Sequence, residues 1–134
     1  MANLTIGQLA ARAGVKVETV RYYERRGLLP APPRSPGGYR LYPAEEAGRI
    51  RFIRRAQSLG FSLREIAELL CLRVDPRSTC QQVKAQTQAK IADIDRKVVA
   101  LRQMRQALAR LAAQCRGRGP TSACPILEAL DAEE

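Results

Sequence analysis

Residues 5–25 read TIGQLAARAGVKVETVRYYER, and this stretch decides the fold. Thr5, followed three residues later by Gln8, forms a capping-box pattern, which predicts that a helix begins here. Gly14 then ends this helix, and a second amphipathic helix follows from Val17. Two short helices joined by a glycine-containing turn are typical of a helix-turn-helix, although the same pattern also fits any small helical hairpin.

The segment after this helix pair favours DNA binding. Gly37 and Gly38 predict a hairpin turn, with residues 28–29 and 39–41 as candidate short strands. A two-stranded wing beside a helix-turn-helix presents side chains to the flank of a duplex. The segment also holds residue types that contact phosphates and sugars, namely Arg34, Tyr39, Arg40 and Tyr42.

Two more helices are predicted before the chain changes character. Pro43 is expected at the first position of a third helix, because proline is well tolerated there. Ser62 and Glu65 form a second capping-box pattern, which opens a fourth helix. Cys71 continues the apolar face of that helix, so we expect it to be a small buried core residue.

Residues 79–115 predict one long helix. The stretch contains no glycine or proline, and its apolar stripe is close to a heptad repeat. A single helix of this length cannot cover its stripe locally, so the same helix of a second subunit is the expected partner. The stripe consists of Val83, Thr87, Ile91, Ile94, Val98, Leu101, Met104, Leu108, Leu111 and Cys115.

Composition limits the function classes. The 134 residues hold 23 Lys and Arg against 13 Asp and Glu, a formal charge of +10, which favours a nucleic-acid partner. The absence of histidine excludes Cys-His zinc fingers and most general-base catalysis, so we expect no enzyme. The sequence contains no apolar run typical of a signal peptide and none long enough to span a membrane. We therefore expect a soluble, cytoplasmic protein without membrane association.

Cysteines stand at positions 71, 80, 115 and 124. Cys80 and Cys115 are 35 residues apart at opposite ends of the long helix, roughly 50 Å, so one chain cannot join them through one ion. A parallel dimer would bring Cys80 to its own copy, whereas an antiparallel dimer crossing near residues 97–98 would set it beside Cys115 of the other chain. The loop 116–123 is long enough to return Cys124 to the same place.

Three thiolates without histidine favour a soft ion: mercury(II), cadmium(II), lead(II), copper(I), or zinc(II) with an added ligand. Two other interpretations stay open. Cys115 and Cys124 are able to act as a redox switch by forming a disulfide, or the cysteines are incidental core residues. A thiol-disulfide enzyme does not fit, because the spacing from Cys115 to Cys124 is not the usual Cys-x-x-Cys arrangement.

The chain resembles the MerR family of metal-responsive transcription regulators over essentially its full length. The motifs that carry the resemblance are Leu4-Thr5-Ile6-Gly7, Val17-Glu18-Thr19-Val20-Arg21-Tyr22-Tyr23-Glu24, Gly27-Leu28-Leu29, Gly38-Tyr39-Arg40-Leu41-Tyr42, Arg51-Phe52-Ile53-Arg54 and Leu59-Gly60-Phe61-Ser62-Leu63-Arg64-Glu65-Ile66.

This resemblance implies a mainly α fold: a winged helix-turn-helix and connecting helices at 1–72, an antiparallel dimerisation coiled-coil helix at 73–115, and a metal-binding loop with a short helix at 116–134. It implies a homodimer on promoter DNA that represses without metal. With metal bound, the dimer distorts the DNA so that RNA polymerase opens it. The residues expected at DNA are Lys16, Thr19, Arg21, Tyr22, Arg34, Tyr39 and Arg40.

The cysteine pattern also resembles one branch of the family. Cys80 of one chain with Cys115 and Cys124 of the other, followed by Pro125-Ile126-Leu127, is similar to the mercury-sensing members. Mercury(II) is therefore the expected effector. Zinc(II), lead(II) and cadmium(II) are the alternatives, since residues 72–76 and 126–130 are somewhat zinc-like and lead- and cadmium-type members share the three-cysteine spacing.

Overall fold

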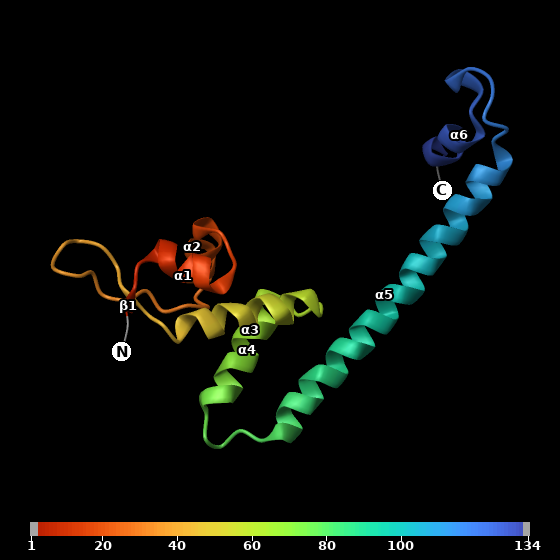
Figure 1. Cartoon of the computed structure of the whole chain (residues 1–134). Coiled ribbons are helices and arrows are strands. Elements are labelled where there is room, and N and C mark those ends of the chain that lie inside the picture. The colour runs from red at the N-terminus through yellow and green to blue at the C-terminus, as the bar shows by residue number, and fades with distance from the viewer. Residues whose placement is uncertain (1–2, 133–134) are drawn as a thin grey trace. The chain divides into compact units, whose positions relative to one another are not determined.

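The computed structural model describes residues 3–132 (Figure 1). The chain divides into two compact units, Met1–Lys90 and Ile91–Glu134. The long helix α5 belongs to both. In chain order the elements are β1 (Asn3–Leu4), α1 (Ile6–Ala13), α2 (Val17–Arg25), β2 (Tyr42–Pro43), α3 (Glu46–Ser58), α4 (Leu63–Val74), α5 (Cys80–Gln114), the 3₁₀ turn η1 (Thr121–Ala123) and α6 (Pro125–Asp131).

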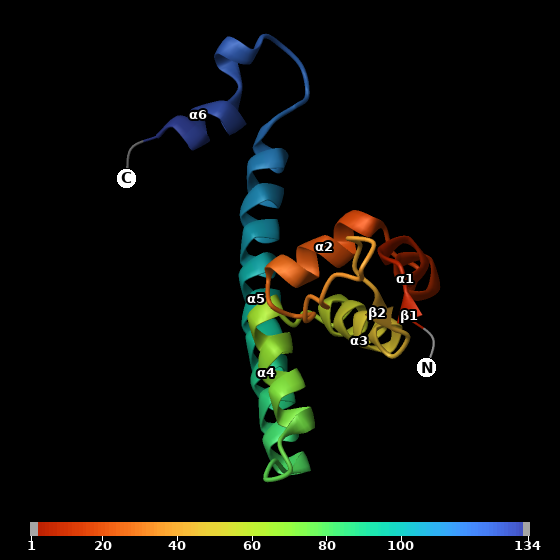
Figure 2. The ribbon, with the colours of Figure 1, turned by 90° about the vertical axis from the view of Figure 1, so that its left-hand side faces the viewer.

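The predicted helix pair is confirmed. The Thr5 side chain accepts from the backbone N–H of Gln8, and the Gln8 side chain accepts from the backbone N–H of Thr5, so the first turn of α1 is capped from both directions. Gly14 ends α1 with φ of 73°, a left-handed conformation that glycine adopts without steric cost. This sharp turn sets α2 across α1, as Figure 2 shows.

The hydrophobic core of the first unit lies where α1, α2, α3 and α4 meet. Its largest fully buried side chains come from every part of the unit, including the loop after α2. They exclude water from the helix contacts, which is the main stabilising effect in a unit of this size. These side chains are Leu9, Val20, Leu28, Tyr42, Ile50, Ile53 and Ile66.

Three details of the wing and α3 differ from the prediction. Leu28 and Leu29 are buried core residues rather than a strand. The hairpin instead pairs Arg34 with Arg40 through an isolated antiparallel bridge. Pro43 does not begin α3, because it belongs to β2 and pairs with Asn3, and α3 starts only at Glu46. Pairing with the N-terminal segment holds the chain extended at this point.

α4 returns along the first turns of α5. Its capping box is confirmed, since the Ser62 side chain accepts from the Glu65 backbone and the Glu65 side chain accepts from the Ser62 backbone. Ile66 and Leu70 are buried as predicted, but Cys71 is exposed in the single chain, so its expected burial is wrong here. The buried face of α4 ends one residue before the cysteine.

The long helix is confirmed to within one residue at each end, at Cys80–Gln114. Lys90 alone is buried along α5, all of whose residues lie in the described part of the chain. The second unit holds the rest of α5, then η1 and α6. None of the helices between residues 3 and 132 combines the length and apolar character that crossing a bilayer requires.

Candidate nucleic-acid interface and metal centre

α2 has one face in the core and one in solvent. Val20 and Tyr23 are buried, whereas Arg21 and Tyr22 are exposed. The Tyr23 hydroxyl donates to Oε1 of Gln57 on α3 at 2.7 Å, and burial raises the pKa of the Tyr23 phenol above its ordinary value. Tyr23 therefore fixes α2 against α3, and this leaves the neighbouring side chains of Arg21 and Tyr22 exposed to solvent.

Tyr22 lies in a small cationic cluster at the end of α2. The guanidinium carbons of Arg25 and Arg26 lie 6.0 and 5.8 Å from the centre of its ring, and Arg26 donates to the Tyr22 hydroxyl at 3.1 Å. Guanidinium groups beside an aromatic face are favourable. The cluster presents a planar ring together with positive charge, a combination that suits a sugar–phosphate backbone.

The wing is a short hairpin closed by a turn over residues 35–38. The N–H of Gly38 donates to the carbonyl of Ser35 at 2.9 Å, and the N–H of Ser35 donates to the carbonyl of Tyr39. Arg34 donates from Nη1 to the Gly38 carbonyl at 2.7 Å, which fixes its guanidinium across the turn. Tyr39 is exposed at the tip of this hairpin.

Glu24 joins the wing to α2. One carboxylate oxygen accepts from Nη1 of Arg40 at 2.8 Å and the other accepts from the Tyr42 hydroxyl. The Glu24 side chain is only 9% exposed, so this charge-assisted contact lies largely away from water. Burial, together with the Glu24 carboxylate, raises the pKa of Tyr42 to about 12. The Tyr42 phenol therefore keeps its proton and donates it in the hydrogen bond to Glu24.

This arrangement corrects one expectation and extends another. Tyr42 is 1% exposed and is not available to phosphate, although the sequence suggested it. Arg40 is half-exposed and shares its guanidinium between Glu24 and the surface. Because a guanidinium carries five N–H donors, Arg40 keeps donors for a phosphate while Glu24 fixes its direction.

A groove of about 380 Å³ lies between α2 and the wing. It brings together four of the seven residues predicted to approach DNA, and Glu24 lies among them. Lys16, at the N-cap of α2, and Thr19 and Tyr22 on α2 do not line it. The groove is lined by Thr5, Ile6, Arg21, Glu24, Arg34, Gly38, Tyr39, Arg40 and Tyr42.

The sequence reasoning missed Glu24 and the start of α1 as parts of this groove. One signal was present: Glu24 follows Arg21 by three residues, so the two share a helix face. A lone carboxylate between arginines on a face expected at DNA indicates a positioning partner for one of them. Thr5 and Ile6 gave no such signal, because their place depends on the tertiary fold.

The cysteines fall in three places. Cys115 and Cys124, both half-buried, line one hollow of about 380 Å³ in the loop after α5. Cys80 is exposed at the first turn of the same 35-residue helix, and Cys71 is exposed near the end of α4. Within residues 3–132, no three Cys, Asp or Glu side chains of one chain gather closely enough to hold a metal ion.

The loop hollow suits a soft metal ion. The backbone N–H of Gly117 donates a weak hydrogen bond to Sγ of Cys115 at 3.4 Å, which helps to orient the thiol. The two thiols supply soft ligands, and no carboxylate lines the hollow to offer a hard one. Cys115 and Cys124 are therefore two candidate thiolate ligands within one chain.

The apolar stripe of α5 is uncovered in the single chain. Ile91, Ile94, Val98, Leu101, Met104 and Leu108 are all exposed. A row of large apolar side chains at heptad-like spacing is typical of a helix that packs against another helix.

The sequence matches the family of MerR HTH regulatory proteins over residues 4–71 and the MerR DNA-binding family over residues 47–111. It is 41% identical over 134 residues to the mercuric resistance operon regulatory protein of Serratia marcescens, covering all of this chain and 92% of that protein. It is also 41% identical over 128 residues to the HTH-type transcriptional regulator ZntR of Escherichia coli (strain K12), covering 94% and 91% of the two chains.

A solved structure gives the same family. The transcription regulator PbrR691 from Ralstonia metallidurans CH34, crystallised in complex with lead(II), is 39% identical and superposes with a TM-score of 0.85 over 95% of this chain and 98% of that one. The helix-turn-helix, the wing and the 35-residue α5 described above are the parts of that fold. The chain belongs to the MerR family of metal-responsive transcription regulators, which bind promoter DNA and are not enzymes.

Proposed function

We propose that the chain forms an antiparallel homodimer that senses mercury(II) through Cys80 of one subunit with Cys115 and Cys124 of the other. One observation carries this proposal: Cys115 and Cys124 share one hollow, while Cys80 stands at the far end of a 35-residue helix, about 50 Å away. A second, oppositely directed α5 is the simplest source of the missing ligand.

The exposed stripe of α5 supports the dimer. Ile94 and Val98 lie near the middle of the helix, so two antiparallel copies crossing there would bury the stripe along most of its length. Each fully buried Leu, Ile, Val or Met side chain contributes about 1.5–3 kcal/mol. The same crossing places the first turn of one α5 beside the loop after the other.

Mercury(II) is the first choice of effector because a site of three thiolates without histidine or carboxylate suits a large, thiophilic ion. Mercuric resistance regulators from several bacteria are 40–42% identical to this chain over nearly all of its length. Lead(II) is the second candidate, since PbrR691 was crystallised with that ion. Zinc(II) and cadmium(II) follow, and zinc(II) would need a further ligand to complete a tetrahedral site.

In the proposed mechanism, residues 1–72 hold the promoter, residues 73–115 form the dimer and residues 116–134 close on the metal. Arg21, Thr19 and Tyr22 approach bases and nearby phosphates from α2. Lys16, Arg34, Tyr39 and Arg40 hold the sugar–phosphate backbone from the turn and the wing. The metal-free dimer represses.

Metal binding joins the two subunits at each end of the coiled coil. It selects the dimer state that bends and untwists the promoter, and RNA polymerase then opens the DNA. The coupling is between dimer geometry and DNA shape, so a metal that binds both dimer states equally would not induce.

The test is a titration of the reduced protein on its promoter with mercury(II), lead(II), cadmium(II) and zinc(II), following metal affinity and transcription in the same reaction. We expect mercury(II) to induce at the lowest free concentration. Cys80→Ser, Cys115→Ser and Cys124→Ser should each lose induction while keeping operator binding, and Cys71→Ser is the matched control that keeps both. Normal induction by Cys80→Ser would overturn the inter-subunit site.

An added arm with an oxidant and no metal separates a thiol redox switch from a metal sensor. A switch based on a Cys115–Cys124 disulfide would respond to an oxidant without metal, and added reductant would abolish the response. A metal sensor responds in the presence of reductant, and Cys80 is required.

A further inference from the structure

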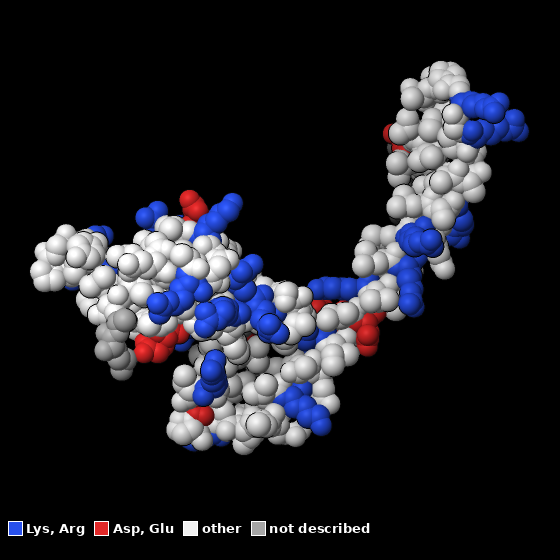
Figure 3. Space-filling model, in the orientation of Figure 1, with Lys and Arg blue, Asp and Glu red and all other residues white. Residues whose placement is uncertain are grey.

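The second half of α5 and the loop that follows it are rich in cationic side chains, and the acidic residues Glu128, Asp131, Glu133 and Glu134 come only after this stretch. Residues 96–127 contain seven Lys and Arg and no Asp or Glu. The charges continue into the loop after α5, where Figure 3 shows a cluster of blue side chains. The seven are Arg96, Lys97, Arg102, Arg105, Arg110, Arg116 and Arg118.

Two of these cationic residues belong to the loop that carries the thiols. Arg116 and Arg118 line the same hollow of about 380 Å³ as Cys115 and Cys124, and none of the residues that line it is acidic. Both arginines are exposed, while both thiols are half-buried. A ligand that enters this hollow therefore has two arginine side chains among its neighbours.

The form in which a thiophilic ion reaches this hollow matters. A reducing compartment contains abundant small thiols, so such an ion travels as a complex with two thiolates rather than as a free ion. When those thiols carry carboxylates, the complex is an anion. A cationic approach attracts an anion and raises its association rate, typically by 10- to 1,000-fold for well-focused fields.

We propose that the sensor takes its metal from an anionic complex with carboxylate-bearing small thiols, and that Arg116 and Arg118 attract this complex to Cys115 and Cys124. The inference rests on the proposed function, because it concerns how the effector enters that site. It names the class of ligand that delivers the metal and gives the two arginines a role separate from metal coordination.

The exchange is balanced without any redox step. Sγ of Cys115 and Sγ of Cys124 each form a bond to mercury as the two small-thiol sulfurs leave, and the two protein thiol protons end on the two released thiols. Cys80 of the partner then adds as the third thiolate and releases one proton to solvent. The charge of the metal does not change at any point.

The experiment measures the rate of mercury(II) transfer to the reduced wild-type protein by stopped-flow absorbance of the three-coordinate mercury–thiolate band, which the two-coordinate donor complexes lack. Mercury(II) is supplied as its complex with 3-mercaptopropionate, 2-mercaptoethanol or cysteamine, which are small thiols bearing a negative, no and a positive charge. Arg116→Gln/Arg118→Gln is compared with Arg12→Gln/Arg64→Gln, two exposed arginines in the first unit. Both variants lose two positive charges, and the wild-type-to-variant ratio cancels the intrinsic reactivity of each thiol.

We expect Arg116→Gln/Arg118→Gln to slow transfer from the mercaptopropionate complex at least about fivefold. Transfer from the mercaptoethanol complex should be unchanged and transfer from the cysteamine complex faster. The effect should shrink as salt rises, because at about 0.1 M the screening length falls to roughly 10 Å. The control variant should match wild type with all three complexes.

Two outcomes overturn the proposal. Equal slowing with all three complexes would mean that the arginines shape the loop or balance the bound site, and equal rates in wild type and variant would mean that they do not act on entry. Failure of the proposed function looks different, because the three-coordinate mercury–thiolate band would then fail to form in any arm.

Discussion

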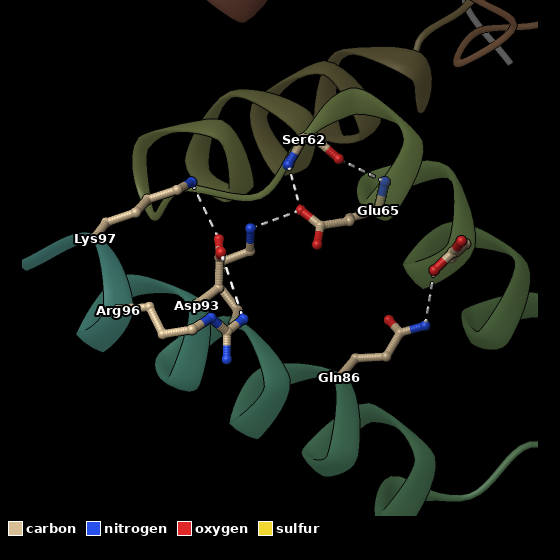
Figure 4. A network of polar contacts seen from close by, with 8 residues as sticks. Ser62, Glu65, Gln86, Asp93, Arg96 and Lys97 are labelled. Carbon is tan, nitrogen blue, oxygen red and sulfur yellow. Dashed lines mark hydrogen bonds and ion pairs between the residues drawn. The ribbon is translucent and has the colours of Figure 1, made fainter. Parts of the chain in front are cut away.

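Nζ of Lys90 on α5 lies 2.8 Å from Oε1 of Glu65 in the first turn of α4. Figure 4 shows the network of polar contacts around Glu65. The ammonium also lies 5.9 Å from the centre of the Phe61 ring. One turn earlier on α5, Nε2 of Gln86 donates to Oε2 of Glu68 on α4 at 3.4 Å. These contacts attach the first turns of α5 to α4.

The first prediction concerns this ion pair. The Lys90 ammonium, and after it the Ser62 backbone N–H, hold the pKa of Glu65 below its ordinary value of 4.5. Glu65→Gln keeps an oxygen that can cap Ser62 but loses the ion pair. Because the Glu65 side chain is 39% exposed, solvent screens the pair, and we expect a loss of about 0.5–1 kcal/mol in the free energy of urea unfolding at neutral pH.

The pH dependence has a fixed sign. A carboxyl group whose pKa is lowered in the folded state stabilises the fold above its unfolded pKa, and this stabilisation is lost as pH falls through the folded value. The difference between wild type and Glu65→Gln should therefore shrink below pH 4.5. A difference that stays constant into acid would show that the ion pair is not its source. Glu65→Ala, which also removes the cap, should cost about 1 kcal/mol more.

The second prediction concerns Glu24. Replacing it with Gln weakens the acceptor that holds Arg40 and Tyr42, so the wing is less firmly placed beside α2. We expect operator affinity to fall about tenfold, or ~1.4 kcal/mol. Fluorescence anisotropy over a range of salt concentrations measures both the affinity and its salt dependence.

The salt dependence distinguishes positioning from direct contact. Glu24 carries no positive charge, so Glu24→Gln should leave the slope of log affinity against log salt unchanged. Arg34→Gln, which removes a proposed phosphate contact, should lower that slope by about one. Unchanged affinity in Glu24→Gln, or a changed slope, would remove the positioning role.

The third prediction uses two adjacent valines of α5. Val98 lies on the apolar stripe and Val99 lies beside it, and both are exposed in the single chain. Val98→Glu places a charge in the proposed subunit contact and should raise the dimer dissociation constant by well over tenfold, as measured by sedimentation equilibrium. Val99→Glu should change it little. Equal effects of the two substitutions would argue against the proposed contact face.

Most of the fold was predictable because its signals are local. The capping residues Thr5 and Ser62, the turn at Gly14 and the heptad-like stripe each act within a few turns of their own helix. Periodicity and capping therefore placed both ends of α1 and α5 and the starts of α2 and α4 to within one residue.

The errors fall where distant contacts decide the structure. Pro43 is held extended by pairing with Asn3, forty residues earlier in the chain. This pairing outweighs the local preference of proline for the first position of a helix. Tyr42 is a residue type that often contacts DNA, but here its side chain is buried and its hydroxyl donates to Glu24. Cys71 follows the apolar stripe of α4 past the point where the first unit has side chains to cover it.

For the candidate site, the sequence suggested the chemistry better than the geometry. Four cysteines and no histidine favour a soft-metal site over a hard-metal one, and their positions single out three of them. That Cys115 and Cys124 share a hollow required the loop conformation, and that Arg40 is tied to Glu24 required the wing. In the proposed site, the third thiolate comes from a second chain, which neither the sequence nor a single chain shows.

A mixing experiment tests that last point most directly. Cys80→Ser keeps Cys115 and Cys124, and Cys115→Ser/Cys124→Ser keeps Cys80, so neither homodimer has a complete three-thiolate site. If the site is shared between antiparallel subunits, co-refolding the two variants restores tight binding of one mercury(II) ion per mixed dimer, read from the three-coordinate mercury–thiolate absorbance. Mixed dimers that form and yet recover no such site would contradict the shared-site account.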